Sequence, residues 1–260
     1  MIHPTAIIDP GAEVGKEVSV GPYVVIGPNV TIGDGCSIGS HAVVESHARL
    51  GRNVKVSSFA SIGAPPQDLK YRGEETWVEI GDDVIVREYA TINRGTVTGE
   101  GITRVGSNSM IMAYVHIAHD CQVGSRVIMA NAATLAGHVH IEDGAFIGGL
   151  SAVHQFVSIG TLAIVGGMSG ISQDVPPYVK AVAARQGRNR SLFGLNVIGL
   201  QRAGMSAEAI DLLKKAYRVI FRSELPLKDA LMKAEAEIEQ SAEVRRLIGF
   251  IRSSKRGVLR

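Results

Sequence analysis

Aliphatic residues recur at every sixth position along most of this chain. The row begins at Ile2 and continues through eleven positions to Ile62, resumes at Ile80 for three positions, and runs through twelve more from Val105 to Ile171. Neither an α-helix nor an alternating strand repeats every six residues, because their side-chain periods are about 3.6 and 2 residues. One short strand plus a corner takes up six residues, so the pattern predicts coils stacked into a parallel β-helix.

A second row of small or aliphatic residues lies four positions after each anchor, and we expect it to face inward as well. Cys36 and Cys121 both fall in this row, which favours core packing over a redox or metal role. Two cysteines in a chain of 260 residues also make no disulfide framework. The row begins with Ala6, Ala12, Val18, Val24, Val30, Cys36 and Ala42.

Hexads such as I-G-P-N-V-T and I-G-D-G-C-S resemble those of the hexapeptide-repeat acyltransferases. The resemblance implies a prism with three hexads in each coil and a left-handed winding, against the usual right-handed preference of parallel crossovers. Residues 1–180 are then the β-helix. Loops are expected near 64–78 and 96–104, where the aliphatic row is interrupted, and loops leaving a solenoid tend to gather on one functional face.

The six-residue period stops after two consecutive prolines, and a different pattern follows. Residues 180–190 hold four cations and no acid and are expected to form a linker. Residues 191–260 are predicted to form a helical C-terminal domain, in which Ser206 and Ser241 are N-caps and Pro226 opens another helix. Such a domain would also cap one end of the solenoid.

The charge balance excludes several function classes. Lysine and arginine total 27 against 25 acidic residues, which gives no signal for nucleic-acid or membrane-surface binding. No run of 18 apolar residues and no secretory signal pattern is present, so a cytoplasmic protein that does not span a membrane is expected.

Polar residues that are scattered over 40 positions converge once the coil is considered. Residues one coil apart occupy equivalent places about 4.8 Å from each other, so His119, Gly137 and Gln155 share a column. Asp120 and His138 belong to the neighbouring column. His154 lies in the column on the other side, whereas His116 sits apart with Thr134 and Ala152.

A general base is the chemistry that fits this cluster best. The imidazole of His119 can take a proton from an alcohol at neutral pH, and Asp120 can hold its tautomer. Consecutive strand residues face opposite ways, so this pairing requires a corner between residues 119 and 120. Gly137 lacks a Cβ, which lets its backbone N–H approach a reacting carbonyl as an oxyanion donor.

Metal binding is the main competing interpretation of the same histidines. His116, His119 and His138 can supply three zinc ligands, and trimeric hexapeptide proteins that resemble gamma-class carbonic anhydrases hold a metal between subunits. The gamma-class ligand spacing is not evident in this chain, and no cysteine or further carboxylate completes the set. We therefore expect no metal, and a gamma-type carbonic anhydrase stays as the alternative from another class.

Six motifs spread along the chain resemble the UDP-N-acetylglucosamine O-acyltransferases of lipid A biosynthesis. The resemblance implies transfer of a 3-hydroxyacyl group from acyl carrier protein to the 3-OH of UDP-N-acetylglucosamine, the first step of lipid A biosynthesis. It also implies a homotrimer with active sites between subunits and no cofactor beyond the acyl carrier protein thioester. The motifs are Q-D-L-K-Y (67–71), H-I-A-H-D-C (116–121), N-A-A-T-L-A-G-H-V (131–139), A-V-H-Q-F (152–156), Q-D-V-P-P-Y-V (173–179) and F-G-L-N (193–196).

This resemblance assigns roles to residues at matching positions. His119 is the general base, Asp120 orients it, and the Gly137 N–H is the oxyanion donor. Residues expected to contact the sugar nucleotide or the acyl chain are Gln67, Asp68, Lys70, His116, His138, His154, Gln155, Asn196 and Arg202.

The C-terminal part departs from the family pattern near the expected uridine site. Ile198 stands where the family commonly has Glu, and Ala203 stands where a second Arg is common. The basic segments 180–190 and 245–260 suit an acidic partner such as acyl carrier protein.

Three alternatives stay open at this point. An N-acyltransferase acting on an amino-sugar nucleotide fits the same residues, because one histidine base serves an alcohol and an amine alike. The carbonic anhydrase interpretation predicts bound zinc. A catalytically silent sugar-nucleotide binding module predicts that replacing His119 leaves binding unchanged.

Overall fold

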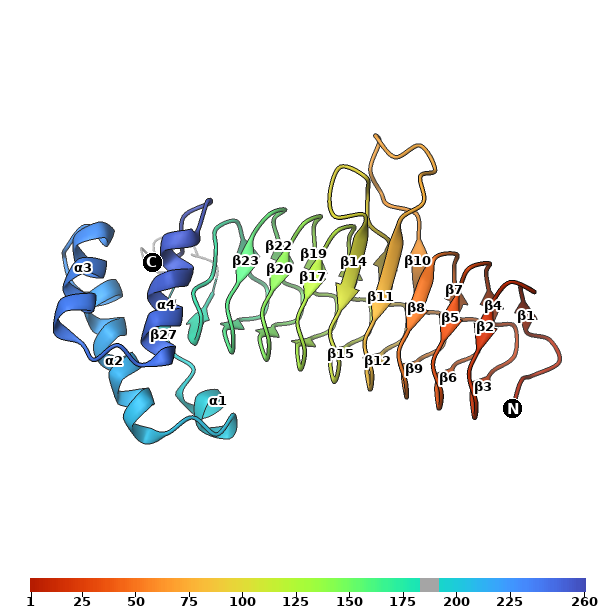
Figure 1. Ribbon diagram of the computed structural model, residues 1–260, viewed down its shortest axis with the longest axis horizontal. Helices are drawn as coiled ribbons and strands as arrows, with labels where there is room; N and C mark the ends of the chain where they lie inside the picture. Colours follow the sequence, from red (N-terminus) through yellow and green to blue (C-terminus); the bar gives the residue numbers. More distant parts are fainter. Residues whose placement is uncertain (183–191) are drawn as a thin grey trace.

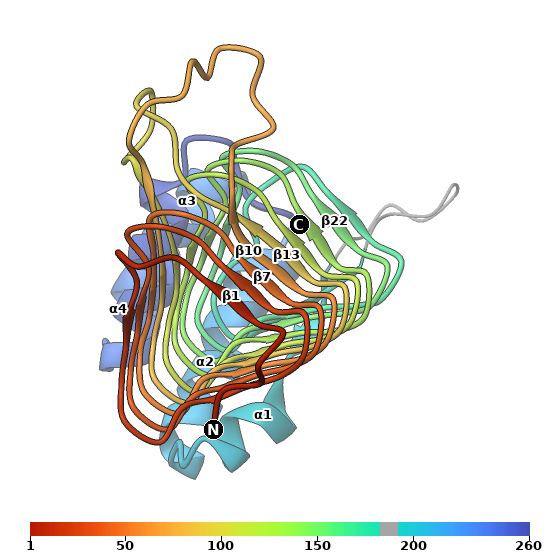
Figure 2. The ribbon, with the colours of Figure 1, turned by 90° about the vertical axis from the view of Figure 1, so that its right-hand side faces the viewer.

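The computed structural model describes residues 1–182 and 192–260, and it shows a prism of stacked β-coils with a group of helices at one end (Figure 1). Viewed along the stack, successive coils overlie one another with a three-sided outline (Figure 2). Each side is one sheet of parallel strands, apart from one antiparallel strand at the end of the third, and the chain visits the three sheets in turn. The six-residue period thus corresponds to one strand and one corner.

The first face of the prism is a nine-stranded parallel sheet. Its strands pair in a register of one coil, so that His116 lies opposite Thr134, and Thr134 lies opposite Ala152, as the sequence columns predict. In spatial order the strands are β1 (Ile7–Ile8), β4 (Val25–Ile26), β7 (Val43–Val44), β10 (Ser61–Ala64), β13 (Thr91–Asn93), β16 (His116–Ile117), β19 (Thr134–Leu135), β22 (Ala152–Val153) and β25 (Gly170–Ile171).

The second face is an eight-stranded sheet whose outward side chains are mostly polar. Arg49 and Arg104 both pair with Glu79 across neighbouring strands of this face, at 2.8 and 3.1 Å. The strands are β2 (Glu13–Val14), β5 (Thr31–Ile32), β8 (Ala48–Leu50), β11 (Trp77–Ile80), β14 (Ile102–Val105), β17 (Gln122–Val123), β20 (His140–Ile141) and β23 (Ser158–Ile159).

The third face has ten strands and joins the prism to the C-terminal part. Its parallel strands are β3 (Ser19–Val20), β6 (Ser37–Ile38), β9 (Lys55–Val56), β12 (Ile85–Val86), β15 (Met110–Ile111), β18 (Ile128–Met129), β21 (Phe146–Ile147), β24 (Ile164–Val165) and β26 (Val179–Ala181). The last strand, β27 (Leu192–Leu195), pairs with β26 in the antiparallel sense.

The core consists of the two inward rows of aliphatic side chains. Anchors such as Ile62, Ile117 and Ile147 are fully buried, whereas Ile2, on the first coil, is half exposed because no coil covers it on one side. Burying each such side chain contributes about 1.5–3 kcal/mol. Cys36 and Cys121 are free and buried in the second row, as predicted.

Two loops leave the prism where the aliphatic row is interrupted (Figure 1). The first loop comprises residues 65–76, between β10 and β11, and the second loop comprises residues 94–101, between β13 and β14. Both are shorter than the sequence prediction, because β11 pairs with β14 from Trp77 onward and with β8 from Val78 onward, and β14 already starts at Ile102. These bounds correct the expected loops at 64–78 and 96–104.

The C-terminal part contains four helices: α1 (Val197–Arg202), α2 (Ala207–Arg222), α3 (Leu227–Glu237) and α4 (Ala242–Ser253). The predicted N-caps are present, since the Ser206 hydroxyl accepts from the Ala209 N–H at 3.2 Å and the Ser241 hydroxyl accepts from the Val244 N–H at 3.3 Å. Pro226 precedes α3 as expected.

The region assigned to helices by the sequence begins instead with a strand, β27, which extends the third face. Within the predicted basic linker, residues 180–182 are described and the remainder lies outside the described residues. Among the described helices, none is both long and apolar enough to cross a bilayer.

Candidate active site

The predicted catalytic residues and both loops lie at one corner of the prism. The first loop connects β10 to β11, the second connects β13 to β14, and His119 and Asp120 connect β16 to β17. Each of these connections passes from the first face to the second face. The site is therefore assembled on successive coils of a single corner, which we call the catalytic corner.

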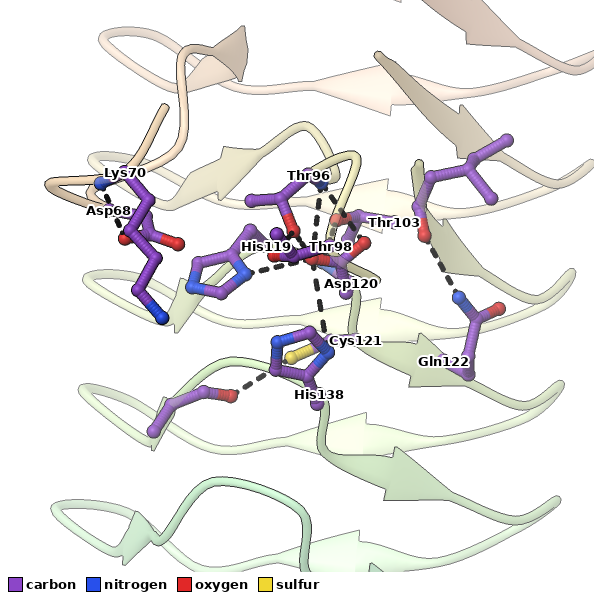
Figure 3. Close-up of polar contacts among 12 residues, drawn as sticks. Asp68, Lys70, Thr96, Thr98, Thr103, His119, Asp120, Cys121, Gln122 and His138 are labelled. Atoms are coloured by element: carbon purple, nitrogen blue, oxygen red, sulfur yellow. Dashed lines mark hydrogen bonds and ion pairs between the residues drawn. The ribbon is translucent and has the colours of Figure 1, made fainter. Parts of the chain in front are cut away.

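His119 and Asp120 form a hydrogen-bonded pair at this corner. The His119 Nδ1 lies 2.9 Å from the Asp120 Oδ2 (Figure 3). The required corner is present, because Asp120 adopts a left-handed backbone conformation with φ of 59°. A carboxylate can only accept, so Nδ1 carries the proton and Nε2 of the neutral ring keeps its lone pair for the reacting group.

The Asp120 carboxylate is almost completely buried and held from several sides. Its Oδ2 accepts the Thr96 hydroxyl at 2.6 Å, and the Thr96 backbone N–H donates to both oxygens at 3.0 and 3.1 Å. The Asp120 N–H in turn donates to the Thr103 hydroxyl at 2.8 Å. Burial opposes ionisation, but the hydrogen bonds from His119 and Thr96 outweigh it and lower the pKa of Asp120 below its ordinary value.

Gly137 lies directly against the His119 ring on the next coil. A Cβ added to Gly137 would stand 2.5 Å from the His119 Cε1 and 2.7 Å from its Nε2. No described residue accepts a hydrogen bond from the Gly137 N–H. Because Gly137 has no side chain, the His119 ring fits against it, and the Gly137 N–H remains available beside Nε2, as an oxyanion site requires.

His138 and His116 complete the aromatic surroundings of the pair. His138 contacts His119 edge-on, with centroids 5.0 Å apart, and stacks on Phe156 at 4.5 Å. The His116 Nδ1 lies 2.8 Å from the Thr91 hydroxyl. Burial lowers the pKa of both histidines, and the nearby charge of His119 lowers the pKa of His116 further. Both side chains therefore favour the neutral form.

His154 and Gln155 lie exposed one coil beyond Ala136 and Gly137, as the columns predict. The His154 Nδ1 stands 3.1 Å from the Gln155 carbonyl and 3.3 Å from an Arg256 guanidinium nitrogen. The C-terminal segment holds Arg256 here, because the Asp174 N–H donates to the Gly257 carbonyl at 3.0 Å.

The first loop supplies the remaining polar residues of the catalytic corner. Gln67 and Lys70 are exposed, and the partly buried Asp68 accepts the Lys70 backbone N–H at 2.9 Å. Figure 3 shows Asp68 and Lys70 on the same side of the corner as the His119 ring. A small hollow between the two loops is lined by Asp68, Lys70, Tyr71, Glu74 and residues 96–98.

Asn196 and Arg202 are not brought to this corner by their own chain. Figures 1 and 2 place α1 on the side of the molecule opposite to the two loops. The Asn196 side chain caps α1 by accepting from the Gly199 N–H at 3.1 Å and donates to the Leu162 carbonyl at 3.0 Å. Arg202 is exposed at the end of α1. Ile198 and Ala203, which differ from the family pattern, are exposed as well.

The possible metal ligands differ from those that the sequence suggested. Within the described residues, the atoms close enough to share an ion belong to His119, Asp120 and His138, and His116 is not among them. The Asp120 Oδ2 already accepts from the His119 ring, the Thr96 hydroxyl and the Thr96 N–H. Its lone pairs are directed at these donors, so the group fits an orienting carboxylate better than a ligand set.

A hollow of about 770 Å³ lies elsewhere, on the second face. Its charged side chains pair with one another: Arg49 and Arg104 with Glu79, and Arg246 with Glu142 at 3.0 Å. It contains neither His119 nor Gly137. We therefore place the chemistry at the catalytic corner, where the proton-transfer groups are.

Sequence reasoning missed the residues that hold the site together. Thr96 and Thr103 fix Asp120, and Arg94 contacts the first loop through Tyr71. These residues flank or occupy interruptions of the repeat, where no period indicates which side chains meet. The one available signal is N-R-G-T at residues 93–96, a polar run directly after an aliphatic anchor.

Comparison with known proteins agrees with this fold. The model for domain 2 of UDP N-acetylglucosamine O-acyltransferases matches residues 174–259, and the bacterial transferase hexapeptide model matches residues 11–46, 29–64 and 102–137. A solved UDP-N-acetylglucosamine acyltransferase from Bacteroides fragilis superposes with a TM-score of 0.96 at 42% identity, covering 100% of both chains. The predicted fold class, a left-handed β-helix followed by helices, is confirmed.

Relatives of known name match over the whole chain. Acyl-[acyl-carrier-protein]--UDP-N-acetylglucosamine O-acyltransferases from Janthinobacterium sp. (strain Marseille) and Thermodesulfovibrio yellowstonii are 51% and 52% identical to it. Each comparison covers 100% of this chain and 99% of the relative. The chain therefore belongs to the acyl-[acyl-carrier-protein]--UDP-N-acetylglucosamine O-acyltransferase family.

Proposed function

We propose that this protein transfers a 3-hydroxyacyl group from acyl carrier protein to the 3-OH of UDP-N-acetylglucosamine, the first step of lipid A biosynthesis. The observation that carries the proposal is the His119–Asp120 pair, with a free Gly137 N–H beside the His119 ring. The full-length relatives named for this activity support the choice of substrates.

The mechanism follows from the free lone pair on Nε2 of His119, since Nδ1 is hydrogen-bonded to Asp120. His119 Nε2 takes the proton of the sugar 3-OH while the oxygen attacks the thioester carbonyl. The resulting oxyanion accepts a hydrogen bond from the Gly137 N–H. Collapse of this intermediate breaks the carbon–sulfur bond, and the imidazolium returns its proton to the departing thiolate. Asp120 stabilises the imidazolium between these two transfers.

The surrounding residues would orient the two substrates. Asp68 and His116 are suited to the sugar hydroxyls, and Lys70 is suited to the diphosphate by its charge. Gln67, His138, His154 and Gln155 line the same corner over successive coils. The mechanism needs no metal and no cofactor beyond the thioester donor.

We further propose a homotrimer with each site between two subunits. The corner between the third and first faces exposes a ladder of stacked rings with centroids about 5.0 Å apart, formed by Tyr23, His41, Phe59, Tyr89 and Tyr114. Leu150 and Met168 continue it at 66% and 72% exposure. An exposed apolar stripe of this length favours burial against another copy. Asn196 and Arg202 would then reach the uridine end of a neighbouring site.

The expected location is the cytoplasm, where both substrates would meet the protein. The basic segments 180–190 and 245–260 would face the acidic acyl carrier protein. Within the second segment, Arg246 and Arg252 are paired with Glu142 and Glu235. Lys255 is exposed and is the better candidate for this contact.

The test incubates the protein with UDP-N-acetylglucosamine and 3-hydroxyacyl carrier protein and measures the acylated sugar nucleotide by mass spectrometry. We expect an O-acylated product at an equal rate with and without a chelator. A wild type that forms no product contradicts the proposal, and a chelator that abolishes turnover contradicts the metal-free mechanism.

A further inference from the structure

The four residues N-R-G-T at 93–96 connect the first loop to the catalytic pair. Asn93 is the last residue of the strand β13, and the other three begin the second loop. Arg94 is 8% exposed and Thr96 is 3% exposed, although both are polar. Buried polar groups need hydrogen-bond partners, and the partners of Arg94 and Thr96 lie in two different parts of the site.

Backbone and amide groups of the segment hold both ends of the first loop. The Asn93 side-chain amide donates to the Pro65 carbonyl at 2.7 Å, where the loop begins. The Gly95 N–H donates to the Trp77 carbonyl at 3.1 Å, where the loop ends. A Cβ on Gly95 would overlap with the backbone of Ile102, so the close approach requires glycine.

The Arg94 side chain reaches the middle of the same loop. One of its terminal nitrogens donates to the Ser46 hydroxyl at 2.8 Å and to the Gly63 carbonyl at 3.3 Å, beneath the loop. The other donates to the Tyr71 hydroxyl at 2.9 Å, and Tyr71 donates onward to the Glu74 carbonyl at 2.8 Å.

All of these acceptors are neutral, and Arg94 forms no ion pair within the described residues. Its Nε is buried without a hydrogen-bond partner. A buried guanidinium without a counter-charge is costly, so Arg94 contributes little to stability as a charge. What it supplies is a planar fork that spans four fixed acceptors, the Ser46 hydroxyl and carbonyl, the Gly63 carbonyl and the Tyr71 hydroxyl, which a lysine ammonium cannot reproduce.

The other end of the segment holds the catalytic carboxylate. Thr96 donates its hydroxyl to Asp120 at 2.6 Å and its N–H to both carboxylate oxygens. Gly99 packs against the same carboxylate, since a Cβ there would stand 2.5 Å from the Asp120 Oδ1. Arg94 and Thr96, with a single residue between them, thus contact two different parts of the site.

We propose that residues 93–96 are a positioning segment that fixes the substrate loop and the catalytic pair relative to each other. Arg94 acts through Tyr71 on the loop that carries Asp68 and Lys70, and Thr96 acts through Asp120 on His119. The two ends therefore control different kinetic parameters: Arg94 and Tyr71 control sugar-nucleotide binding, and Thr96 controls the chemical step. This inference rests on the proposed function and deepens it.

The first test removes one hydroxyl from the loop. Tyr71→Phe keeps the ring and loses only the bonds to Arg94 and Glu74. We expect the KM for UDP-N-acetylglucosamine to rise about tenfold, the effect of about one net hydrogen bond, while kcat stays within about twofold. The KM for 3-hydroxyacyl carrier protein should not change. Arg94→Lys should raise the same KM at least as far.

The second test removes one hydroxyl from the other end. Thr96→Val should lower kcat about tenfold with both KM values unchanged, because the lost hydroxyl donates to Asp120 and contacts no described residue of the first loop. Thr96→Ser retains the hydroxyl and should restore most of the turnover. The loss of this donor also moves the pKa of Asp120 upward, so the acidic limb of the pH–rate profile should move to higher pH in Thr96→Val.

Tyr217→Phe is the matched control for Tyr71→Phe. Tyr217 lies on α2, and its hydroxyl also accepts from a guanidinium, that of Arg222, at 2.7 Å. This variant should lose stability without any change in KM or kcat. A merely structural role for Tyr71 would give the same pattern at both tyrosines.

The outcomes separate the inference from the function that it deepens. If wild type makes product but Tyr71→Phe and Thr96→Val bind and turn over as wild type does, the positioning role is wrong and the proposed function stands. If Tyr71→Phe and Thr96→Val change the same parameter, the division between the two ends is wrong. A wild type that makes no product overturns both.

Discussion

The catalytic corner and the corner between the third and first faces, which carries the ring ladder, are built from the same backbone turn. Asp120 and His138 have φ of 59° and 61°, and Tyr89 and Tyr114 have φ of 58° and 62°. Each residue comes three positions after an inward anchor, and Tyr89 stacks on Tyr114 as His138 stacks on Phe156 one coil away. The two corners therefore have the same backbone conformation at these positions.

What differs is the environment of the side chains. At the ladder corner, Tyr89 and Tyr114 are 45% and 61% exposed and stack on other rings of the ladder. At the catalytic corner, two loops leave the prism, and Thr96 on one of them covers the Asp120 carboxylate. The same turn thus becomes a contact surface or a reaction site according to whether a loop buries it.

Turnover at the catalytic corner should fall when the His119 ring is displaced from its position against Gly137. Gly137→Ala puts a methyl group into the His119 ring, so the ring must move and the oxyanion donor moves relative to it. We expect kcat to fall about 100-fold, the usual cost of misplacing a reacting group by about 1 Å. Steady-state kinetics with both substrates measures this.

Gly170→Ala is the control for that substitution. Gly170 lies on β25 of the same prism, and a Cβ there would meet nothing within 4 Å. Its kcat should equal that of wild type. Equal losses in the two variants would contradict a specific role for Gly137.

A charged substitution in the ladder corner should prevent assembly of the proposed trimer. Tyr89→Lys places a charge in the middle of the stacked rings, where the proposed neighbour would bury it without a partner. We expect dissociation of the trimer in sedimentation experiments and a parallel loss of activity. Met232→Lys, at a 56% exposed position on α3, should remain trimeric.

A smaller effect concerns how the stability of the region beside the catalytic corner depends on pH. Burial lowers the pKa of His116 in the folded chain below its ordinary value near 6.5. Below about pH 6.5 the unfolded chain therefore binds a proton that the folded chain does not, so the free energy of unfolding falls as the pH falls through this range. His116→Gln should show a shallower loss of thermal stability between pH 7.5 and 5.5.

His140→Gln serves as the comparison, because His140 is exposed on β20 of the second face. It should leave the pH dependence of the melting temperature as in wild type. If both histidine variants have the wild-type slope, the burial of His116 does not contribute to acid sensitivity.

The repeat made much of this structure predictable from the sequence. A period of six determines which side chains face inward, and a coil of three hexads determines which outward residues stack, so the position of His119 against Gly137 follows from their spacing. The N-caps Ser206 and Ser241 were also predictable, because capping depends on local sequence. Local and periodic interactions carry this information.

Contacts across interruptions were not predictable, for a physical reason. Arg94 reaches Ser46 and Tyr71, and Thr96 reaches Asp120, through loops that follow no period. The strand β27 depends on its antiparallel pairing with β26 and has no pattern of its own. The roles of Asn196 and Arg202 stay predictions, because they depend on a neighbouring subunit.

The central claim is that His119 is the base that activates the sugar hydroxyl at the catalytic corner. The most direct measurement is the initial rate of acylated sugar nucleotide formation by His119→Ala at saturating concentrations of both substrates, in protein shown to be trimeric and folded. The account predicts a rate about 10² to 10⁴-fold below that of wild type, with binding of UDP-N-acetylglucosamine largely retained. A rate equal to that of wild type would contradict it.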